Sequence, residues 1–355
     1  IMAPILRGGT VAVTGAAGFI GGWIVRQLLD KGYRVRACVR DEVDASKTSF
    51  LKALPGYASG RLTVHSADLN TDGCFDDIFK GCHGVAHVSH VNDYENPDYI
   101  KKVCSHIIKS VEASESVNRV IVTSSVAAVV SERNMEEMVK RPVIYEDRYP
   151  DANSDRVSGY SKSKQLAEQM FTEAADGSGM WDSITCCPAD NVGPIQSAHQ
   201  GNAGPWQGLM KKMLLGECDP AVHGYRPWHT VDVRDTAACH IGLLESVEVQ
   251  NGERYIAFST DQIHLEDVCE RIDRLLPELG YAAPDLTEDL DEAGLERRER
   301  RRGVYAGTQM RNDRMRATVG IEFRDLDDSL RDMAESLITV GEVKPVLRSG
   351  YSVKS

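Results

Sequence analysis

Two polar side chains one helical turn apart are the clearest candidates for chemistry in this sequence. Tyr160 and Lys164 stand four positions apart in a segment that reads as a helix, which puts both on one face. A free tyrosine has a pKa of about 10, too high for proton exchange at neutral pH. A neighbouring ammonium and the charge of an oxidised nicotinamide should both lower that pKa. The pair therefore predicts general acid-base chemistry.

A hydroxyl that donates to the substrate oxygen would complete such a site. Ser125 is the second residue after a predicted strand at residues 119–123. Open α/β sheets hold ligands at the carboxyl ends of their strands, so Ser124 and Ser125 are in the expected place. A Y-x-x-x-K spacing alone is common by chance; the order glycine loop, Ser-Ser, Y-x-x-x-K is not. We predict Ser125, Tyr160 and Lys164 as the catalytic residues.

A G-x-x-G-x-x-G motif follows the first predicted strand at once. Its glycines are Gly15, Gly18 and Gly21. Without β-carbons the chain can turn tightly, and backbone N–H groups can approach a pyrophosphate at the positive end of the following helix. Between a β-branched strand and an amphipathic helix, this motif predicts a dinucleotide site. Its expected residues are Gly15, Gly18, Phe19, Ile20 and Gly21.

The end of the second predicted strand indicates which dinucleotide binds. NAD enzymes commonly place a carboxylate there, but this position holds Val39 and is followed by Arg40. A guanidinium suits the 2'-phosphate of NADP by charge and by its forked donors. Asp41 could instead turn inward, and Lys47 could add a second charge or be only a solvated side chain. We predict NADP, with Arg40 at the phosphate.

Asp68 and Leu69, just after the third predicted strand, are placed to reach the adenine.

The pattern of hydrophobic residues predicts the fold that positions all of these side chains. Short β-branched runs alternate with amphipathic segments, which is typical of a doubly wound α/β fold with a parallel sheet. Strands are expected at 10–14, 34–39, 62–65, 84–88, 119–123, 183–187 and 253–258, and helices at 19–31, 72–80, 98–116, 158–175 and 232–245.

Beyond Pro188 the alternation of predicted strands and helices becomes less regular, and the sequence is rich in glycine and proline. We therefore expect a Rossmann domain of residues 1–188 plus 227–258. A smaller substrate lobe should comprise residues 189–226 plus 259–355.

Composition excludes several classes of protein. The 355 residues are 42% apolar and 26% charged, which is typical of a soluble globular chain. A net charge of -12 opposes binding to nucleic acid. The longest apolar stretch falls short of the roughly 20 residues of a membrane helix. Residues 1–9 are too few for a secretory signal.

Nine cysteines without a C-x-x-C pair fit a reducing cytoplasm. His83, His87 and His90 are clustered but lack accompanying ligands at metal spacing, so no metal is expected. Monomer and homodimer are both open.

The chain resembles the extended short-chain dehydrogenases/reductases of the dihydroflavonol reductase and cinnamoyl-CoA reductase group over nearly its whole length. The segments that carry the resemblance are residues 13–21, 33–41, 84–88, 119–125, 160–164, 187–188, 192–194, 232–235, 319–323 and 329–332. The resemblance implies that Ser125, Tyr160 and Lys164 are catalytic and that Lys164 also holds the nicotinamide ribose. It further implies that Arg40 contacts the NADP phosphate, Val88 borders the cofactor and Pro188 borders the nicotinamide.

The sequence departs from this group in two places. Residues 103–106 hold no Asn of the kind that many members carry before the fifth strand, and residues 126–140 do not match closely enough to transfer a substrate. We expect NADPH-dependent reduction of a small-molecule ketone or aldehyde. The alternatives are an NAD-dependent sugar-nucleotide epimerase or dehydratase, and a non-catalytic NADP-sensing regulator. Against a dehydratase, Val126-Ala127-Ala128 offers no acidic residue after Ser125.

Overall fold

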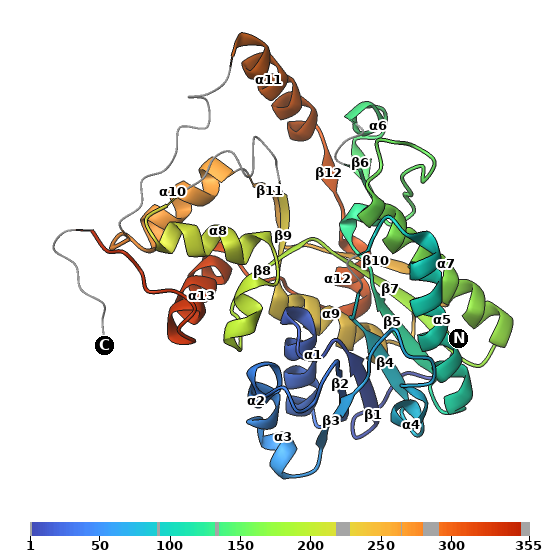
Figure 1. The fold of residues 1–355 in the computed structure, drawn as a ribbon. Helices are drawn as coiled ribbons and strands as arrows, with labels where there is room; N and C mark the ends of the chain where they lie inside the picture. The colour runs from blue at the N-terminus through green and yellow to red at the C-terminus, as the bar shows by residue number, and fades with distance from the viewer. Residues whose placement is uncertain are drawn as a thin grey trace.

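The computed structural model describes residues 2–90, 93–131, 135–217, 228–263, 265–279 and 291–348. A seven-stranded parallel sheet forms its centre (Figure 1). From one edge to the other its strands are β3 (Leu62–Ser66), β2 (Arg34–Val39), β1 (Thr10–Thr14), β4 (Gly84–His87), β5 (Arg119–Thr123), β7 (Asp182–Pro188) and β10 (Arg254–Ala257). The chain winds outward in both directions from the pair β1 and β4. Such a reversal opens a crevice at the carboxyl ends of these two strands.

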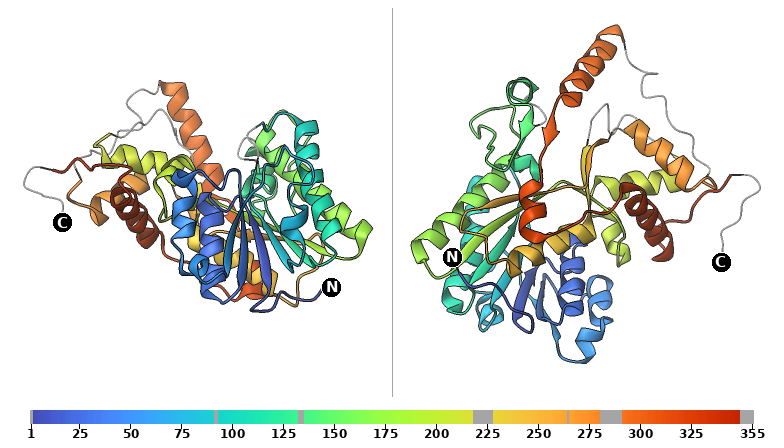
Figure 2. Two further views of the ribbon diagram at one scale, coloured as in Figure 1. Left: turned by 60° about the horizontal axis from the view of Figure 1, so that its bottom comes forward. Right: turned by 180° about the vertical axis from the view of Figure 1, so that it is seen from behind.

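Helices cover both faces of this sheet, as the doubly wound expectation requires (Figure 2). On one face, α1 (Phe19–Asp30) packs against α9 (Val233–Glu245), with α12 (Asp313–Val319) beside α9. On the other face, α5 (Pro97–Ser114) packs against α7 (Gly159–Ser178) and α4 (Asp76–Phe79). The sheet is therefore buried on both sides, which explains why its strands are nearly continuous apolar runs.

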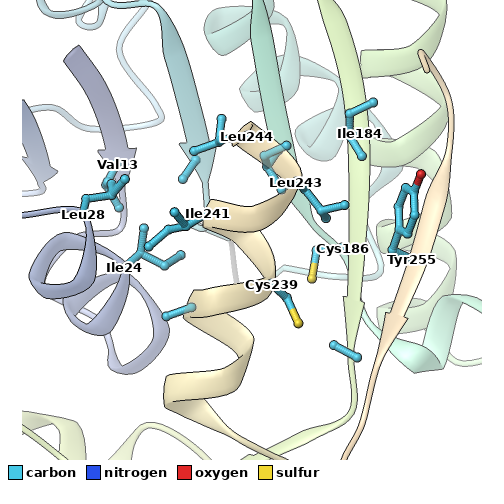
Figure 3. Packing of buried hydrophobic residues seen from close by; sticks show 14 of the residues in the cluster. Val13, Ile24, Leu28, Ile184, Cys186, Cys239, Ile241, Leu243, Leu244 and Tyr255 are labelled. Carbon is cyan, nitrogen blue, oxygen red and sulfur yellow. The ribbon is translucent and has the colours of Figure 1, made fainter. Parts of the chain in front are cut away.

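The α1–α9 layer shows why these segments become helices. Ile24 and Leu28 recur at helical spacing, are fully buried and point toward Ile241 of α9 (Figure 3). Two residues earlier in α9, Cys239 lies beside Cys186 of β7. The apolar residues at helical spacing thus form the face that the helix buries.

A second group of elements lies beside the carboxyl edge of the sheet (Figure 1). Helices α8 (Pro205–Leu214), α10 (Leu265–Leu275) and α13 (Leu326–Thr339) bury a hydrophobic cluster of their own. A small sheet accompanies them, in the order β11 (Thr260–Ile263), β9 (Trp228–Asp232) and β8 (Asp190–Val192). A third sheet pairs β6 (Val143–Ile144) with β12 (Gln309–Met310), next to α6 (Met135–Lys140) and α11 (Glu292–Ala306). The junction of the expected lobes at 226 and 227 lies outside the described residues.

The prediction of a helix over residues 72–80 is wrong in extent. Only Asp76–Phe79 is helical, because Gly73 takes φ +75° and turns the chain just before. Two short helices, α2 (Ala45–Lys52) and α3 (Pro55–Ala58), fill the connection between β2 and β3, where none was expected. None of the helices in the described ranges is both long and apolar enough to cross a membrane.

Candidate active site

A cavity of about 1250 Å³ opens along the carboxyl edge of the main sheet. Its wall includes loops after β1, β2, β3, β4, β5 and β7, the start of α7, and the start of α8 from the second group of elements. The structure brings every predicted site residue into this one wall: Gly15, Gly18, Phe19, Ile20, Gly21, Arg40, Asp68, Leu69, Val88, Ser125, Tyr160, Lys164 and Pro188.

The glycine loop leaves no room for side chains where it turns. Gly15 adopts φ +66°, and a β-carbon there would lie 3.0 Å from the Ser89 backbone. A β-carbon on Gly21 would lie 2.2 Å from the Gly15 carbonyl oxygen. Gly18 is the N-cap of helix α1 and provides no side-chain cap, and the first N–H groups of a helix have no partner within it. This end of the cavity therefore fits a pyrophosphate.

Arg40 lies exposed at the end of β2 and lines the cavity. Among the described residues, none forms an ion pair or hydrogen bond with its guanidinium. Asp41 does not turn inward, since its carboxylate accepts from the Val43 N–H at 3.0 Å. Lys47 pairs with Asp44 at 3.3 Å and is not part of the wall. Arg40 is therefore the positive group that this strand offers to a bound phosphate.

The predicted catalytic hydroxyls lie together. Burial raises the pKa of Tyr160 to about 12, while a hydrogen bond from the Ser125 hydroxyl lowers it. We expected the Lys164 ammonium to bring this pKa down. In the protein alone, burial outweighs it: the Lys164 Nζ lies 5.7 Å from the Tyr160 ring centroid and donates to the Thr123 carbonyl at 2.9 Å. Tyr160 is thus a protonated phenol at neutral pH.

Lys164 belongs to a buried polar network behind the cavity. One turn further along α7, Glu168 accepts a hydrogen bond from the Ser124 hydroxyl. Its other carboxylate oxygen lies 2.9 Å from the Arg254 Nε of β10. Burial lowers the pKa of Lys164 to about 8, and the negative charge of Glu168 opposes this shift. Lys164 is therefore mostly cationic at neutral pH, and the charge of Glu168 favours this state.

The three clustered histidines have three separate roles. His83 Nδ1 accepts from the Thr10 N–H at 3.1 Å. His87 is buried, and its Nδ1 lies 2.9 Å from the Thr14 hydroxyl oxygen. His90 lines the cavity, with its ring edge-on to Tyr160 at 5.9 Å. Within the described ranges, no group of three His, Cys, Asp or Glu side chains could hold a metal ion.

Several residues of the wall were not predicted. The Thr14 hydroxyl accepts from the backbone N–H of Val88 and Ser89, at 3.1 and 3.2 Å, and so joins the ends of β1 and β4. His199 Nε2 lies 2.7 Å from the Ala17 carbonyl oxygen, within the glycine loop. Thr14 could have been found as the last residue of a strand that precedes the loop. His199 carries no local signal, because it is 182 residues away from Ala17.

Comparisons with known proteins find relatives that are reductases. Residues 11–257 match the NAD dependent epimerase/dehydratase family. The chain is 32% identical to a dihydroflavonol 4-reductase of Callistephus chinensis, over 80% of this chain and 77% of that enzyme. It is 39% identical to a dihydroflavonol 4-reductase of Hordeum vulgare, over 54% of this chain and 55% of that enzyme.

A solved structure has the same fold. Vestitone reductase from alfalfa (Medicago sativa) superposes with a TM-score of 0.73 and 26% identity, covering 94% of this chain and all of that one. The superposition confirms the predicted fold over nearly the whole chain.

Proposed function

Because the chain belongs to the NAD-dependent epimerase/dehydratase family of extended short-chain dehydrogenases/reductases, within its dihydroflavonol-reductase-like group, we propose that it is an NADPH-dependent carbonyl reductase. One observation carries the proposal. A glycine loop and Arg40 form one end of a single cavity, and Ser125, Tyr160 and Lys164 line the same cavity. A dinucleotide bound to the loop would extend along the carboxyl edge toward Tyr160.

The cofactor assignment rests on the residues at the end of β2. Val39 offers no carboxylate to a ribose 2'-hydroxyl, and Asp41 is engaged with its own loop. Arg40 lines the cavity and is free to pair with a 2'-phosphate. Asp68 and Leu69 line the same region and would border the adenine, while Val88 and Pro188 would border the nicotinamide.

In the proposed mechanism, a bound NADPH held by the glycine loop and Arg40 would supply the hydride for the carbonyl carbon. Tyr160 donates its phenolic proton to the carbonyl oxygen, so that the product is an alcohol. Ser125 donates a hydrogen bond to that oxygen or to Tyr160 and holds the two in line. Its side-chain oxygen caps the turn Val126–Ala128 by accepting a hydrogen bond from the Ala127 N–H at 3.1 Å, which fixes the hydroxyl's position.

Lys164 supplies positive charge beside the phenol. Its ammonium favours the phenolate that remains after proton transfer, and it would also hold the nicotinamide ribose. The Thr123 carbonyl anchors this side chain from the end of β5. The Lys164 ammonium, fixed by β5 and α7, is thus presented to both cofactor and Tyr160.

The proposal is tested with purified protein, NADPH or NADH, and a panel of ketones and aldehydes, followed by the loss of NADPH absorbance. We expect turnover with NADPH and a preference over NADH. Arg40→Ala should weaken NADPH binding by about tenfold or more and leave NADH binding nearly unchanged, since a charge-assisted pair is lost. Lys47→Ala is the matched control, because Lys47 pairs with Asp44 outside the wall.

Other outcomes would replace this function. Tighter binding of NADH would end the NADP assignment. Protein that retained NAD through many cycles while it interconverted sugar nucleotides would be an epimerase. NADPH binding without turnover of any carbonyl would favour a regulator that senses the cofactor.

A further inference from the structure

One side chain of the cavity wall has a hydrogen-bonding capacity that the protein does not use. Gln207 of α8 is only 1% exposed and lines the cavity. Within the described part of the chain, neither its amide oxygen nor its amide nitrogen has a hydrogen-bond partner. A buried amide without partners costs folding free energy, so a native structure that keeps one needs a reason.

Gln207 belongs to the end of the cavity where the reaction is proposed. Its neighbour Trp206 also lines the cavity and donates from Nε1 to the Asp190 carboxylate at 3.4 Å. Asp190 lies close enough to Tyr160 for its charge to raise the pKa of the phenol. The start of α8 is thus linked through Asp190 to the proposed proton donor.

A purely structural role is the main alternative. Gln207 is the third residue of α8 after the N-cap, Gly204, and a glutamine there can reach back to the N-cap N–H. The side chain does fold over Gly204, since a β-carbon on that glycine would lie 3.1 Å from Gln207 Oε1. No hydrogen bond results. The amide is therefore placed like a cap without acting as one.

We propose that Gln207 binds the substrate, through its amide oxygen and amide nitrogen, and selects carbonyl compounds that carry a hydroxyl group away from the carbonyl being reduced. A hydroxyl both donates and accepts, so it can satisfy a primary amide that offers both functions. This inference rests on the proposed reductase function. A site built to hydrogen-bond a substrate hydroxyl discriminates against the analogue that lacks it, because the buried amide is then left unpaired.

The chain offers a matched control in Gln196. Both of its amide atoms are also buried and without a partner in the described residues. Gln196 does not line the cavity; a β-carbon on Gly22 of α1 would lie 3.0 Å from its Nε2. Replacing either glutamine by leucine removes the same chemical group. Only one of the two replacements should change what the enzyme binds.

The test uses two pairs of probes: benzaldehyde with 3,4-dihydroxybenzaldehyde, and unsubstituted flavanone with a tetrahydroxyflavanone. KM is measured from NADPH absorbance, and Kd by calorimetry in the presence of NADP+. The wild type should favour each hydroxylated probe. Gln207→Leu should raise its KM and Kd for these probes about tenfold and leave the unsubstituted probes unchanged or better bound. Gln196→Leu should behave as the wild type.

The outcomes separate this inference from the function on which it rests. A wild type without preference, or a Gln207→Leu variant that keeps the preference, would overturn the role of Gln207. A lowered Tm with an unchanged preference would also overturn it and identify a helix cap. If none of the four probes consumed NADPH, the reductase function would fail for them, while the Kd values would still measure whether Gln207 recognises the hydroxyl groups.

Discussion

Tyr160 must carry a proton when the substrate arrives, and its burial ensures that it does. Tyr160→Phe removes only the hydroxyl and leaves the ring contacts with His90 and Tyr94 in place. We expect turnover to fall by at least about 10²-fold, the lower range of general acid catalysis, with NADPH affinity retained. Steady-state kinetics and a fluorescence titration with NADPH measure the two effects. Near-normal turnover of this variant would show that another group delivers the proton.

The pKa of Lys164 predicts how activity depends on pH. Burial lowers it to about 8, so the ammonium is present below this pH and lost above it. We therefore expect kcat/KM for reduction to fall as the pH rises through about 8, because a neutral amine no longer favours the phenolate. The Lys164→Met variant should turn over slowly at every pH, and its kcat/KM should not fall as the pH rises through about 8. A wild-type profile that stays flat from pH 7 to 9.5 would contradict this role.

Residues that carry local chemistry were predictable, and residues that act across the fold were not. Tyr160 and Lys164 are four positions apart, and Arg40 follows its strand directly, so spacing alone located them. The pKa of Tyr160 was misjudged because desolvation depends on what packs around the ring, here His90 and Tyr94 from another loop. No sequence motif marks Gln207, because its proposed role follows from an amide without hydrogen-bond partners, which only the structure shows.

At the next scale, the turn between β1 and α1 depends on close backbone contact. Gly21→Ala would place a β-carbon 2.2 Å from the Gly15 carbonyl oxygen, so the loop must shift. We expect NADPH affinity to fall at least about tenfold, because the N–H groups that face the pyrophosphate move with the loop. Equilibrium titration of NADPH measures the loss.

Gly177→Ala provides the control for that substitution. Gly177 lies in α7, and a β-carbon there meets nothing within 4 Å. Because Gly177 lies in the last turn of α7, alanine there should stabilise the protein by at most roughly 0.5 to 1 kcal/mol without affecting NADPH. Unchanged NADPH affinity in Gly21→Ala would show that the loop does not bind the cofactor through its backbone.

Helix α7 and strand β10 are joined by the buried pair of Glu168 and Arg254. Glu168→Gln keeps the shape but leaves the guanidinium without its carboxylate, which should destabilise the fold by about 3 kcal/mol. Because the charge of Glu168 raises the pKa of Lys164, its loss should also move the alkaline limb of the activity profile below pH 8. Denaturant unfolding and the pH profile report the two effects.

An exposed glutamate of the same helix is the control for Glu168. Glu173 accepts from Gln169 at 2.7 Å on the surface of α7. Glu173→Gln should change neither stability nor the pH profile measurably. A Glu168→Gln profile that coincides with the wild type would show that the network supports the fold alone.

Secondary structure was predictable where one element follows another in a parallel sheet. The strands up to β5 were placed to within a residue, because β-branched runs alternate with amphipathic helices there. The second sheet could not be predicted, since β8 and β9 are only three and five residues long and lie far apart in the chain. Its strands pair where the chain brings them together beside α8 and α13, and no local sequence pattern predicts this pairing.

For the whole molecule, we propose that the two expected lobes, residues 1–188 plus 227–258 and residues 189–226 plus 259–355, act as one unit around the cavity. One link is Gln200, which is 1% exposed and donates from Nε2 to the carbonyl oxygens of Ala17 and Gly18, both at 3.1 Å. A residue of the expected substrate lobe therefore holds the loop that would bind the cofactor.

This link predicts that the cofactor orders both lobes. In the wild type, NADPH should slow amide hydrogen exchange in α1 and also in residues 198–214, because the glycine loop and Gln200 are bonded to each other. Gln200→Leu removes both hydrogen bonds, while the Ala17 carbonyl keeps its contact with His199 and the Gly18 carbonyl still accepts from the Gly22 N–H. Stability should therefore fall by about 1 to 3 kcal/mol, the net value of two hydrogen bonds, and NADPH affinity several-fold. In that variant the protection of α1 should remain while that of residues 198–214 is weakened, because the His199 contact with Ala17 still joins this segment to the loop. Gln196→Leu, four residues away, should retain both. Protection confined to α1 in the wild type would show that the lobes bind their ligands independently, and the single-unit proposal would then be wrong.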